Sequence, residues 1–289
     1  MDALGWEAEP PRLRSPVLVC AFAGWNDAAG AATTALTSVA DSFDAELIAQ
    51  VDPEDFFDFQ ANRPTIRLTE GERREIDWPG NVLLAARAPG AERDLVLLSG
   101  TEPNLRWRTF SEGIAEAAES LGVEMVITLG ALIADVAHTL PVPITGLASD
   151  GELVDRLGLT RSNYEGPTGV VGVLHDACRR RGMPSASLWA AVPHYVAAVP
   201  NPKAALALLR RLEGVVGVAV EASGLEEEAG SYESQVSRAV SANPEIEELV
   251  QRLEEEQASS LDLEEDVPSG ESLARDFERF LRQRGGPDA

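Results

Sequence analysis

The stretch from Val17 to Leu36, Val-Leu-Val-Cys-Ala-Phe-Ala-Gly-Trp-Asn-Asp-Ala-Ala-Gly-Ala-Ala-Thr-Thr-Ala-Leu, decides the fold class. It begins with seven consecutive apolar residues, which predict a strand buried on both faces, as in the centre of a parallel sheet. After Gly24 the chain becomes rich in alanine and predicts a helix, since glycine permits the tight turn between the two elements. A buried strand, a turn and a helix are typical of an α/β protein, in which ligands bind beyond the carboxyl ends of the strands.

The turn between this strand and helix does not match a known phosphate-binding motif. Gly24 and Gly30 do not fit G-x-G-x-x-G, and no Gly-Lys-Ser/Thr follows them. Asn26 or Asp27 can cap the helix by accepting hydrogen bonds from its first N–H groups, which is the commoner role of these residues. The alternative is a contact with a polar ligand or partner beside Trp25. Capping does not explain that tryptophan, because a large aromatic side chain at a tight turn must pack against something.

The composition is that of an acidic protein with a full core. The chain has 289 residues, of which 44% are hydrophobic, and this is enough to bury a large core. A net charge of −24 and a pI near 4.4 disfavour binding to nucleic acid or to an anionic membrane. Residues 221–289 hold 19 acidic residues against 6 arginines, a net charge of −13. More than half of the excess charge therefore lies in the last quarter of the chain.

The cysteines and the apolar runs indicate the compartment. Cys20 and Cys178 lie in apolar surroundings without nearby partners, which predicts buried free thiols in a reducing environment. Residues 1–16 hold no apolar segment of a signal peptide, and no apolar run approaches the roughly 18 residues of a membrane span. We expect a cytoplasmic protein that binds neither membrane nor nucleic acid.

The order of the predicted elements defines a mixed sheet. Residues 64–69 and 72–78 predict a hairpin around Glu70-Gly71, in which glycine supplies the positive φ of the turn. The strands predicted at 81–88 and 94–99 are joined without a helix, so they pair antiparallel. Further strands are predicted at 45–51, 124–129, 144–149 and 185–192, with helices between most of them and a loop over 131–143.

Two regions follow from this order. Residues 1–220 predict a three-layer α/β/α sandwich with a mixed, largely parallel sheet. Residues 221–289 predict an acidic helical extension with apolar stripes at 246–253 and 273–281. The charged faces of these helices are typical of solvated surface, and they can also meet a partner.

Polar side chains at the exits of the predicted strands form the candidate site. Strand exits are where α/β proteins keep their chemistry, and the carboxyl ends of parallel strands share one edge of the sheet. We expect a pocket there, with these binding residues: Trp25, Asn26, Asp27, Glu102, Arg106, Asp135, His138 and His194.

The chemistry of this set stays open between binding and catalysis. His138 beside Asp135 could act as a base that a carboxylate orients. Arg106 and Arg108 could hold a phosphate or carboxylate, although pairing with the many acidic residues is the favoured interpretation. No nucleophile elbow, H-E-x-x-H motif or metal-spaced cysteine pair accompanies them. We therefore assign no catalytic residue, no metal and no cofactor, and the sequence favours a protein without enzymatic activity.

Six segments, taken in order, resemble the proteasome assembly chaperone 2 family in its actinobacterial form. They are Phe22-Ala-Gly-Trp-Asn-Asp-Ala-Ala-Gly30, Arg63-Pro-Thr65, Gly100-Thr-Glu-Pro-Asn-Leu-Arg-Trp107, residues 135–143, Tyr164-Glu-Gly-Pro-Thr-Gly169 and Ser187-Leu-Trp-Ala-Ala-Val-Pro-His-Tyr195. The resemblance implies an α/β/α core similar to that of nucleoside phosphorylases, an acidic helical tail and self-association as a trimer. It implies no known reaction. The chain ends Arg284-Gly-Gly-Pro-Asp-Ala289 and so lacks the hydrophobic-Tyr-any-residue tail with which proteins often dock on the proteasome.

Two functional hypotheses follow. The first is a non-catalytic assembly chaperone or scaffold that binds itself and proteasome subunits, which the resemblance and the acidic tail favour. The alternative is a protein that binds, or an enzyme that acts on, a nucleoside or a similar small molecule at the strand exits. Fold alone does not decide between them, because one architecture hosts many activities.

Overall fold

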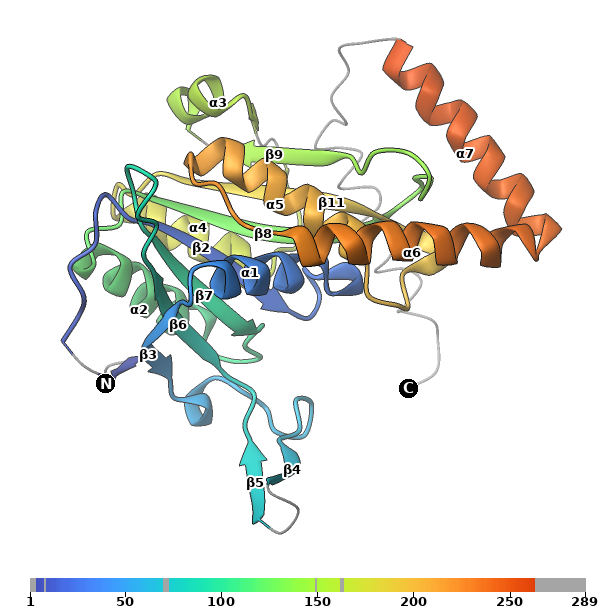
Figure 1. The fold of residues 1–289 in the computed structure, drawn as a ribbon. Coiled ribbons are helices and arrows are strands. Elements are labelled where there is room, and N and C mark those ends of the chain that lie inside the picture. The colour runs from blue at the N-terminus through green and yellow to red at the C-terminus, as the bar shows by residue number, and fades with distance from the viewer. Residues whose placement is uncertain (1–3, 8, 70–72, 149, 162–163, 263–289) are drawn as a thin grey trace.

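The central sheet has the strand order β1-β3-β6-β7-β2-β8-β11-β9-β10 (Figure 1). The computed structural model describes residues 4–7, 9–69, 73–148, 150–161 and 164–262. The strands are β1 Leu4–Trp6, β2 Val17–Ala23, β3 Glu46–Val51, β6 Asn81–Ala86, β7 Leu95–Thr101, β8 Met125–Ala134, β9 Ile144–Ala148, β10 Thr160–Arg161 and β11 Ser185–Pro193.

Strand β2 lies in the parallel centre of this sheet. It pairs in parallel with β7 on one side and with β8 on the other, and β11 continues the parallel set beyond β8. Strands β6, β3 and β1 follow β7 in antiparallel order, and β9 is antiparallel to β11. The side chains of β2 from Val17 to Ala21 are fully buried. The prediction of a central strand buried on both faces is therefore confirmed, as is the antiparallel pairing of the two strands joined without a helix.

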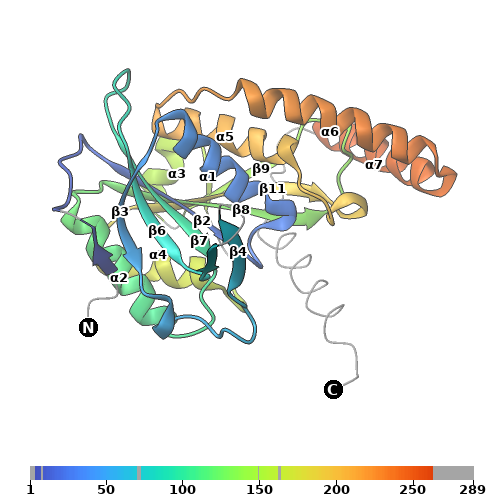
Figure 2. The same ribbon diagram turned by 60° about the horizontal axis from the view of Figure 1, so that its bottom comes forward.

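Helices cover both faces of the sheet (Figure 2). Helices α1 (Ala31–Ser42) and α5 (Pro202–Val216) pack on one face, and α2 (Trp107–Ser120) and α4 (Val170–Arg180) pack on the other. The short helix α3 (Gly151–Leu157) follows β9 and joins the first of these two clusters. Small side chains at Ala31, Ala32 and Ala35 are fully buried and let α1 lie close against the strands. The prediction of a three-layer α/β/α sandwich is confirmed.

Strand β8 is longer than the sequence predicts. The apolar run was expected to end at Gly130 and to give way to a loop from Ala131, yet the strand continues to Ala134. Gly130 lies opposite Trp189 of β11, and a Cβ atom on it would stand 2.4 Å from Cζ3 of that ring. The glycine therefore makes room for a tryptophan on the neighbouring strand, and it does not end the strand.

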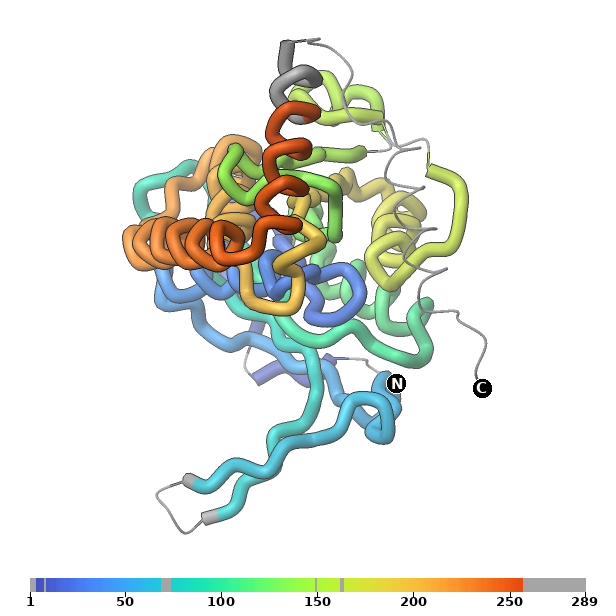
Figure 3. The backbone as a smooth tube through the Cα atoms, turned by 90° about the vertical axis from the view of Figure 1, so that its right-hand side faces the viewer, coloured from blue at the N-terminus to red at the C-terminus, as the bar shows by residue number. Residues whose placement is uncertain are grey.

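The predicted hairpin forms an arm that projects from the body of the molecule (Figures 1 and 3). Strands β4 (Thr65–Thr69) and β5 (Arg73–Asp77) pair antiparallel, with Ile66 opposite Ile76. The turn predicted at Glu70-Gly71 lies outside the described residues. Trp78 at the base of the arm packs edge-on against Phe59, with 4.8 Å between ring centroids. The hairpin prediction is confirmed.

Two long helices follow the sandwich. Helix α6 (Ser223–Ser241) lies along α5, and α7 (Pro244–Asp262) leaves its far end at an angle (Figure 1). Tyr232, Val236 and Val240 of α6 form a small apolar cluster with Val250 and Leu253 of α7. The first apolar stripe of the predicted extension therefore lies in a helix as expected, and the second, at 273–281, lies outside the described residues. The division of the chain at residue 220 stays a prediction.

Two further observations concern the cysteines and the helices. Cys20 and Cys178 are buried and free, as predicted. Among the described residues, no helix combines the length and the apolar character that crossing a membrane requires.

Candidate functional site

The turn after β2 is tied to the second half of β8. The backbone N–H of Ala131 donates to the carbonyl of Asn26 at 2.8 Å, and Asp27 forms a parallel bridge with the same alanine. Gly24 begins the turn with φ of 135°, a conformation that side chains disfavour. The turn is thereby fixed at the carboxyl edge of the sheet, where a ligand would be expected.

Asp27 serves as a cap for α1. Its Oδ1 accepts hydrogen bonds from the backbone N–H of Ala32 at 2.7 Å and of Thr33 at 3.3 Å. Its Oδ2 accepts the hydroxyl proton of Thr33 at 2.5 Å. Burial raises the pKa of this carboxyl above its usual value, although the three hydrogen bonds act in the opposite direction. Gly30 occupies the formal N-cap position, so the aspartate reaches the helix across a short 3-10 turn, Ala28–Gly30.

Glu102 occupies the amino end of α4. The backbone N–H of Val170, the first residue of that helix, donates to Oε1 of Glu102 at 3.0 Å. The side-chain amide of Asn26 donates to the same oxygen at 3.4 Å. A carboxylate at this position satisfies a free N–H group and interacts favourably with the helix dipole. Glu102 therefore joins the exit of β7 to the start of α4 and holds Asn26 beside them.

A pocket of about 170 Å³ lies under α4. Its floor comes from β8, β9 and β11, its roof from α4, and its rim from the turn after β2 and the loop before α4. The lining residues are Trp25, Asn26, Leu132, Leu147, Tyr164, Pro167, Thr168, Gly169, Val171, Gly172, His175, Ser187 and Trp189. Of the predicted site residues, Trp25 and Asn26 belong to it, and Glu102 contacts it through Asn26.

His175 is the histidine that lines this pocket. Its Nε2 lies 3.0 Å from the hydroxyl of Thr128 on β8. Burial lowers the pKa of the imidazole to about 4, because the protonated form loses its hydration there. The ring is therefore neutral at physiological pH. The residue lies within helix α4 and faces the pocket.

Arg106 lies away from the pocket and pairs with an acidic residue. Its guanidinium is 2.6 Å from Asp55, and its Cζ lies 5.9 Å from the ring centre of Phe56. Both partners of the ion pair are about half exposed, so the pair contributes little to stability. The favoured interpretation of this arginine, pairing with an acidic side chain, agrees with the structure.

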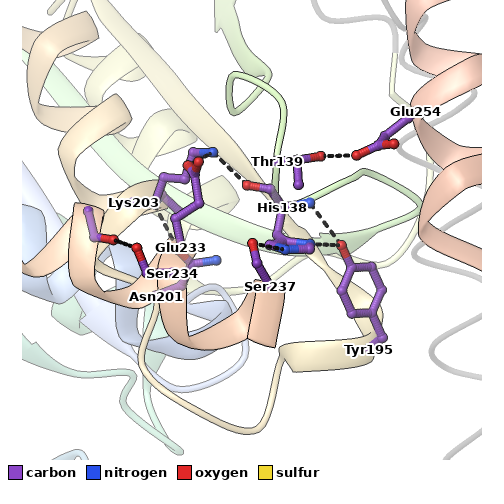
Figure 4. A network of polar contacts seen from close by, with 11 residues as sticks. His138, Thr139, Tyr195, Asn201, Lys203, Glu233, Ser234, Ser237 and Glu254 are labelled. Atoms are coloured by element: carbon purple, nitrogen blue, oxygen red, sulfur yellow. Dashed lines mark hydrogen bonds and ion pairs between the residues drawn. The ribbon is translucent and has the colours of Figure 1, made fainter. Parts of the chain in front are cut away.

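His138 belongs to a different part of the molecule. The hydroxyl of Tyr195 accepts the backbone N–H of His138 at 2.8 Å and lies 2.8 Å from its Nδ1 (Figure 4). Nε2 lies 3.0 Å from the hydroxyl of Ser237 on α6, so each ring nitrogen has a hydroxyl partner, and in a neutral ring one nitrogen donates while the other accepts. Burial, followed by the nearby charge of Lys203, lowers the pKa of the ring. His138 is thus a neutral, buried link between the loop after β8 and helix α6.

Further contacts strengthen this link (Figure 4). The ammonium group of Lys203 donates to the carbonyl of His138 at 2.5 Å and forms an ion pair with Glu233 of α6. Thr139 donates to Glu254 of α7. One loop of the sandwich thereby contacts both long helices.

Asp135 pairs with His194 and not with His138. The Nδ1 of His194 is 3.1 Å from the Asp135 carboxylate, and both side chains are partly exposed. The hypothesis of a His138 base oriented by Asp135 is therefore wrong, because Tyr195 and Ser237 hold the His138 ring. Both polar partners of the His138 ring, Tyr195 and Ser237, lie far from it in the sequence.

The structure divides the predicted site residues between the two faces of the sheet. Trp25, Asn26 and Glu102 gather beside α4, whereas His138 contacts α5 and α6 on the opposite face, and Asp135 pairs with His194. They share the carboxyl edge, as parallel strands require, but the pocket that Trp25 and Asn26 line does not include His138. Sequence reasoning missed Leu132, His175 and Trp189 as lining residues. The signal that could have found Trp189 is Gly130, since a glycine inside a buried strand marks a close approach.

The α/β/α fold is that of a known class of proteins. The PAC2 family matches residues 21–240, and the chain belongs to that family. No curated protein sequence matches the chain.

Two solved structures are similar along most of the chain. A PAC2 family protein from Streptomyces avermitilis is 47% identical, with a TM-score of 0.76, over 81% of this chain and 99% of that one. A proteasome-assembly chaperone homologue from Mycobacterium tuberculosis is 44% identical, with a TM-score of 0.74 and the same two coverages. The archaeal proteasome activator PbaB of Pyrococcus furiosus shares the fold at 17% identity, with a TM-score of 0.65 over 83% of this chain.

Proposed function

We propose that this protein is a non-catalytic assembly chaperone or scaffold that associates with itself, as a trimer, and binds proteasome subunits. Its membership of the PAC2 family supports the proposal, as does its 44% identity to a mycobacterial proteasome-assembly chaperone homologue. The archaeal proteasome activator adds only a shared fold, because its identity is low.

The apolar face of the arm is the observation that carries this proposal. Ile66 and Leu68 alternate along β4, and Ile76 lies opposite Ile66, so the three side chains share one face of the hairpin. They are 60%, 65% and 53% exposed, and Trp78 at the base is 50% exposed. An exposed apolar patch of this kind marks a surface that another protein covers.

The opposite face of the arm is polar. Arg67 forms an ion pair with Asp77 there, and both side chains are well exposed. The face of Ile66, Leu68 and Ile76 also holds Arg74, which lies opposite Leu68. A largely apolar face and a charged opposite face are typical of a strand pair that docks through one side. An isolated hairpin is also marginally stable, so a covering surface would stabilise the arm.

The acidic helices fit a role in meeting a partner. Glu245, Glu248, Glu255 and Glu256 are exposed on α7, while Val250 and Leu253 face α6. A surface of one charge speeds encounter with a complementary partner and disfavours wrong ones. The polar groups at the sheet edge support the non-catalytic part of the proposal, since His138 and Asp27 are held by hydrogen bonds within the fold.

Sedimentation velocity of the full-length protein at micromolar concentration tests this proposal. We expect an oligomer for the wild type and dissociation for the double variant Ile66→Ser, Leu68→Ser, because full burial of a leucine or isoleucine side chain contributes about 1.5–3 kcal/mol. Arg67→Ser, on the opposite face of the same strand, is the matched control and should leave the oligomer intact.

Two outcomes would contradict the proposal. A wild type that sediments only as a monomer excludes self-association. A double variant that sediments like the wild type shows that the arm is not the surface that joins the copies.

A further inference from the structure

The pocket under α4 has aromatic walls from three separate elements. Trp25 follows β2, Tyr164 precedes α4, and Trp189 lies on β11. Aliphatic side chains complete the walls: Leu132, Leu147 and Val171. A concave site lined mainly by aromatic and aliphatic groups favours an apolar ligand, and aromatic rings favour an aromatic one.

The size of the pocket limits the ligand. Its volume is about 170 Å³. An apolar cavity of about 150 Å³ in a protein stays dry and binds benzene. The pocket therefore fits one aromatic ring or two fused rings, and it opens toward solvent at the exposed residues Pro167 and Thr168.

The charge around the pocket excludes an anionic ligand. None of the described residues that line it is a lysine, an arginine or an acidic residue. The amino end of α4, which could attract a phosphate, already holds the carboxylate of Glu102 at 3.0 Å from the N–H of Val170. A phosphate here would meet a carboxylate and no cationic side chain.

A few polar atoms remain available inside. His175 uses Nε2 for Thr128, and among the described residues no second hydrogen bond to its ring is found, which leaves Nδ1 for a ligand. The hydroxyl-bearing side chain of Ser187 is 7% exposed and also lines the pocket. The imidazole is neutral, because burial lowers its pKa to about 4. The site therefore offers one or two hydrogen bonds without charge.

We propose that this pocket binds a small, neutral aromatic compound of one or two rings that carries a single polar ring atom, such as indole. The aromatic walls supply most of the binding, and His175 or Ser187 accepts or donates the one hydrogen bond. This inference goes beyond the proposed scaffold function, since it concerns the opposite face of the sheet from the contacts of His138 and does not involve the arm.

Isothermal titration calorimetry of the full-length wild type with indole tests the proposal. We expect saturable binding with one indole per chain. Adenosine and AMP are titrated in parallel, because they distinguish a nucleoside or nucleotide site from a site for a neutral aromatic compound. Both should bind at least tenfold more weakly than indole.

Two serine variants show whether binding occurs in this pocket. Ser187→Leu places a larger side chain among the lining residues and should weaken indole binding about tenfold or more, which corresponds to about 1.4 kcal/mol. Ser234→Leu makes the same change at an exposed position of α6 and should bind indole like the wild type. If Ser187→Leu does not fold by circular dichroism, Trp25→Ala replaces it, since that residue lies in a turn and contributes one wall.

Three results would overturn the proposal. The first is no saturable binding of indole to the wild type. The second is unchanged indole binding in a folded Ser187→Leu or Trp25→Ala variant. The third is tighter binding of adenosine or AMP than of indole, which would assign the site to a different class of ligand. None of these results bears on the oligomer, so failure here leaves the scaffold proposal to its own test.

Discussion

Lys203, the only lysine of the chain, holds helix α6 against the sandwich. Its side chain is 18% exposed and contacts both the carbonyl of His138 and the carboxylate of Glu233. Lys203→Met removes the ammonium group and keeps most of the aliphatic stem. We expect this variant to loosen α6 while the central sheet stays as stable as in the wild type.

The size of the effect follows from the two contacts. The hydrogen bond to the carbonyl of His138 contributes roughly 1.5–3 kcal/mol, but it joins α5 to the loop after β8 and does not hold α6. The ion pair contributes less, at most about 1 kcal/mol, because the Glu233 side chain is 43% exposed and its charge is screened by water. Opening of α6 breaks only the ion pair, because His138 lies in the sandwich, so a loss of at most about 1 kcal/mol raises the equilibrium constant for local opening of α6 up to about 5-fold.

Hydrogen exchange resolved by mass spectrometry measures this opening. Peptides from Ser223–Ser241 should exchange up to about 5-fold faster in the variant, and peptides from β2 and β8 should be unchanged. Arg211→Met is the matched control, since Arg211 lies on the same helix, α5, and donates to the carbonyls of Leu157 and Gly158 at 3.2 and 2.9 Å. That variant should loosen the end of α3 and leave α6 unchanged.

The reasoning is refuted if exchange in α6 does not change in Lys203→Met. It is also refuted if Arg211→Met speeds hydrogen exchange in α6 to the same extent, because both variants would then act by destabilising helix α5 as a whole.

Three further predictions concern the sheet and its edge. Asp27→Ala removes three hydrogen bonds to the start of α1 and should cost about 1–2 kcal/mol in urea unfolding, with indole binding unchanged if the residue is only a cap. His175 has a pKa of about 4 when folded and an ordinary value of 6.5, so the unfolded chain binds its proton first and stability is lost as the pH falls below about 6.5. In the wild type this group accounts for a loss of about 1 kcal/mol in the free energy of unfolding between pH 7 and 5.5. His175→Gln should reduce that loss. An unchanged pH dependence would show that the ring is hydrated. Gly130→Ala places a Cβ atom 2.4 Å from the Trp189 ring and should destabilise the protein by about 1–3 kcal/mol in thermal unfolding, whereas a neutral result would mean that the ring moves freely.

The elements that the sequence predicted correctly are those with strong local signals. The run of buried residues in β2 and the alanines of α1 identify a strand and a helix without knowledge of the rest of the chain. Asp150 caps α3, as its position before that helix suggests, by accepting the N–H of Leu153 at 2.9 Å. The hairpin at 64–78 likewise follows from alternation and a glycine-containing turn.

The parts that could not be predicted depend on contacts between distant segments. Gly130 predicts a strand end by local rules, and only the position of Trp189 on the next strand explains why the strand continues. His138 has Asp135 nearby in the sequence, but its ring partners, Tyr195 and Ser237, are 57 and 99 residues away. Periodicity finds the edge of the sheet where polar groups gather, and it does not tell which face each group takes.

Native mass spectrometry of the full-length protein, alone and mixed with the core proteasome subunits of its own cell, tests the central claim most directly. It reports the number of copies and the bound partners in one measurement. The scaffold account predicts a homo-oligomer, with a trimer as the expected form, that forms a complex with proteasome subunits, and Ile66→Ser with Leu68→Ser should lose the oligomer. A monomer that binds none of those subunits would contradict it.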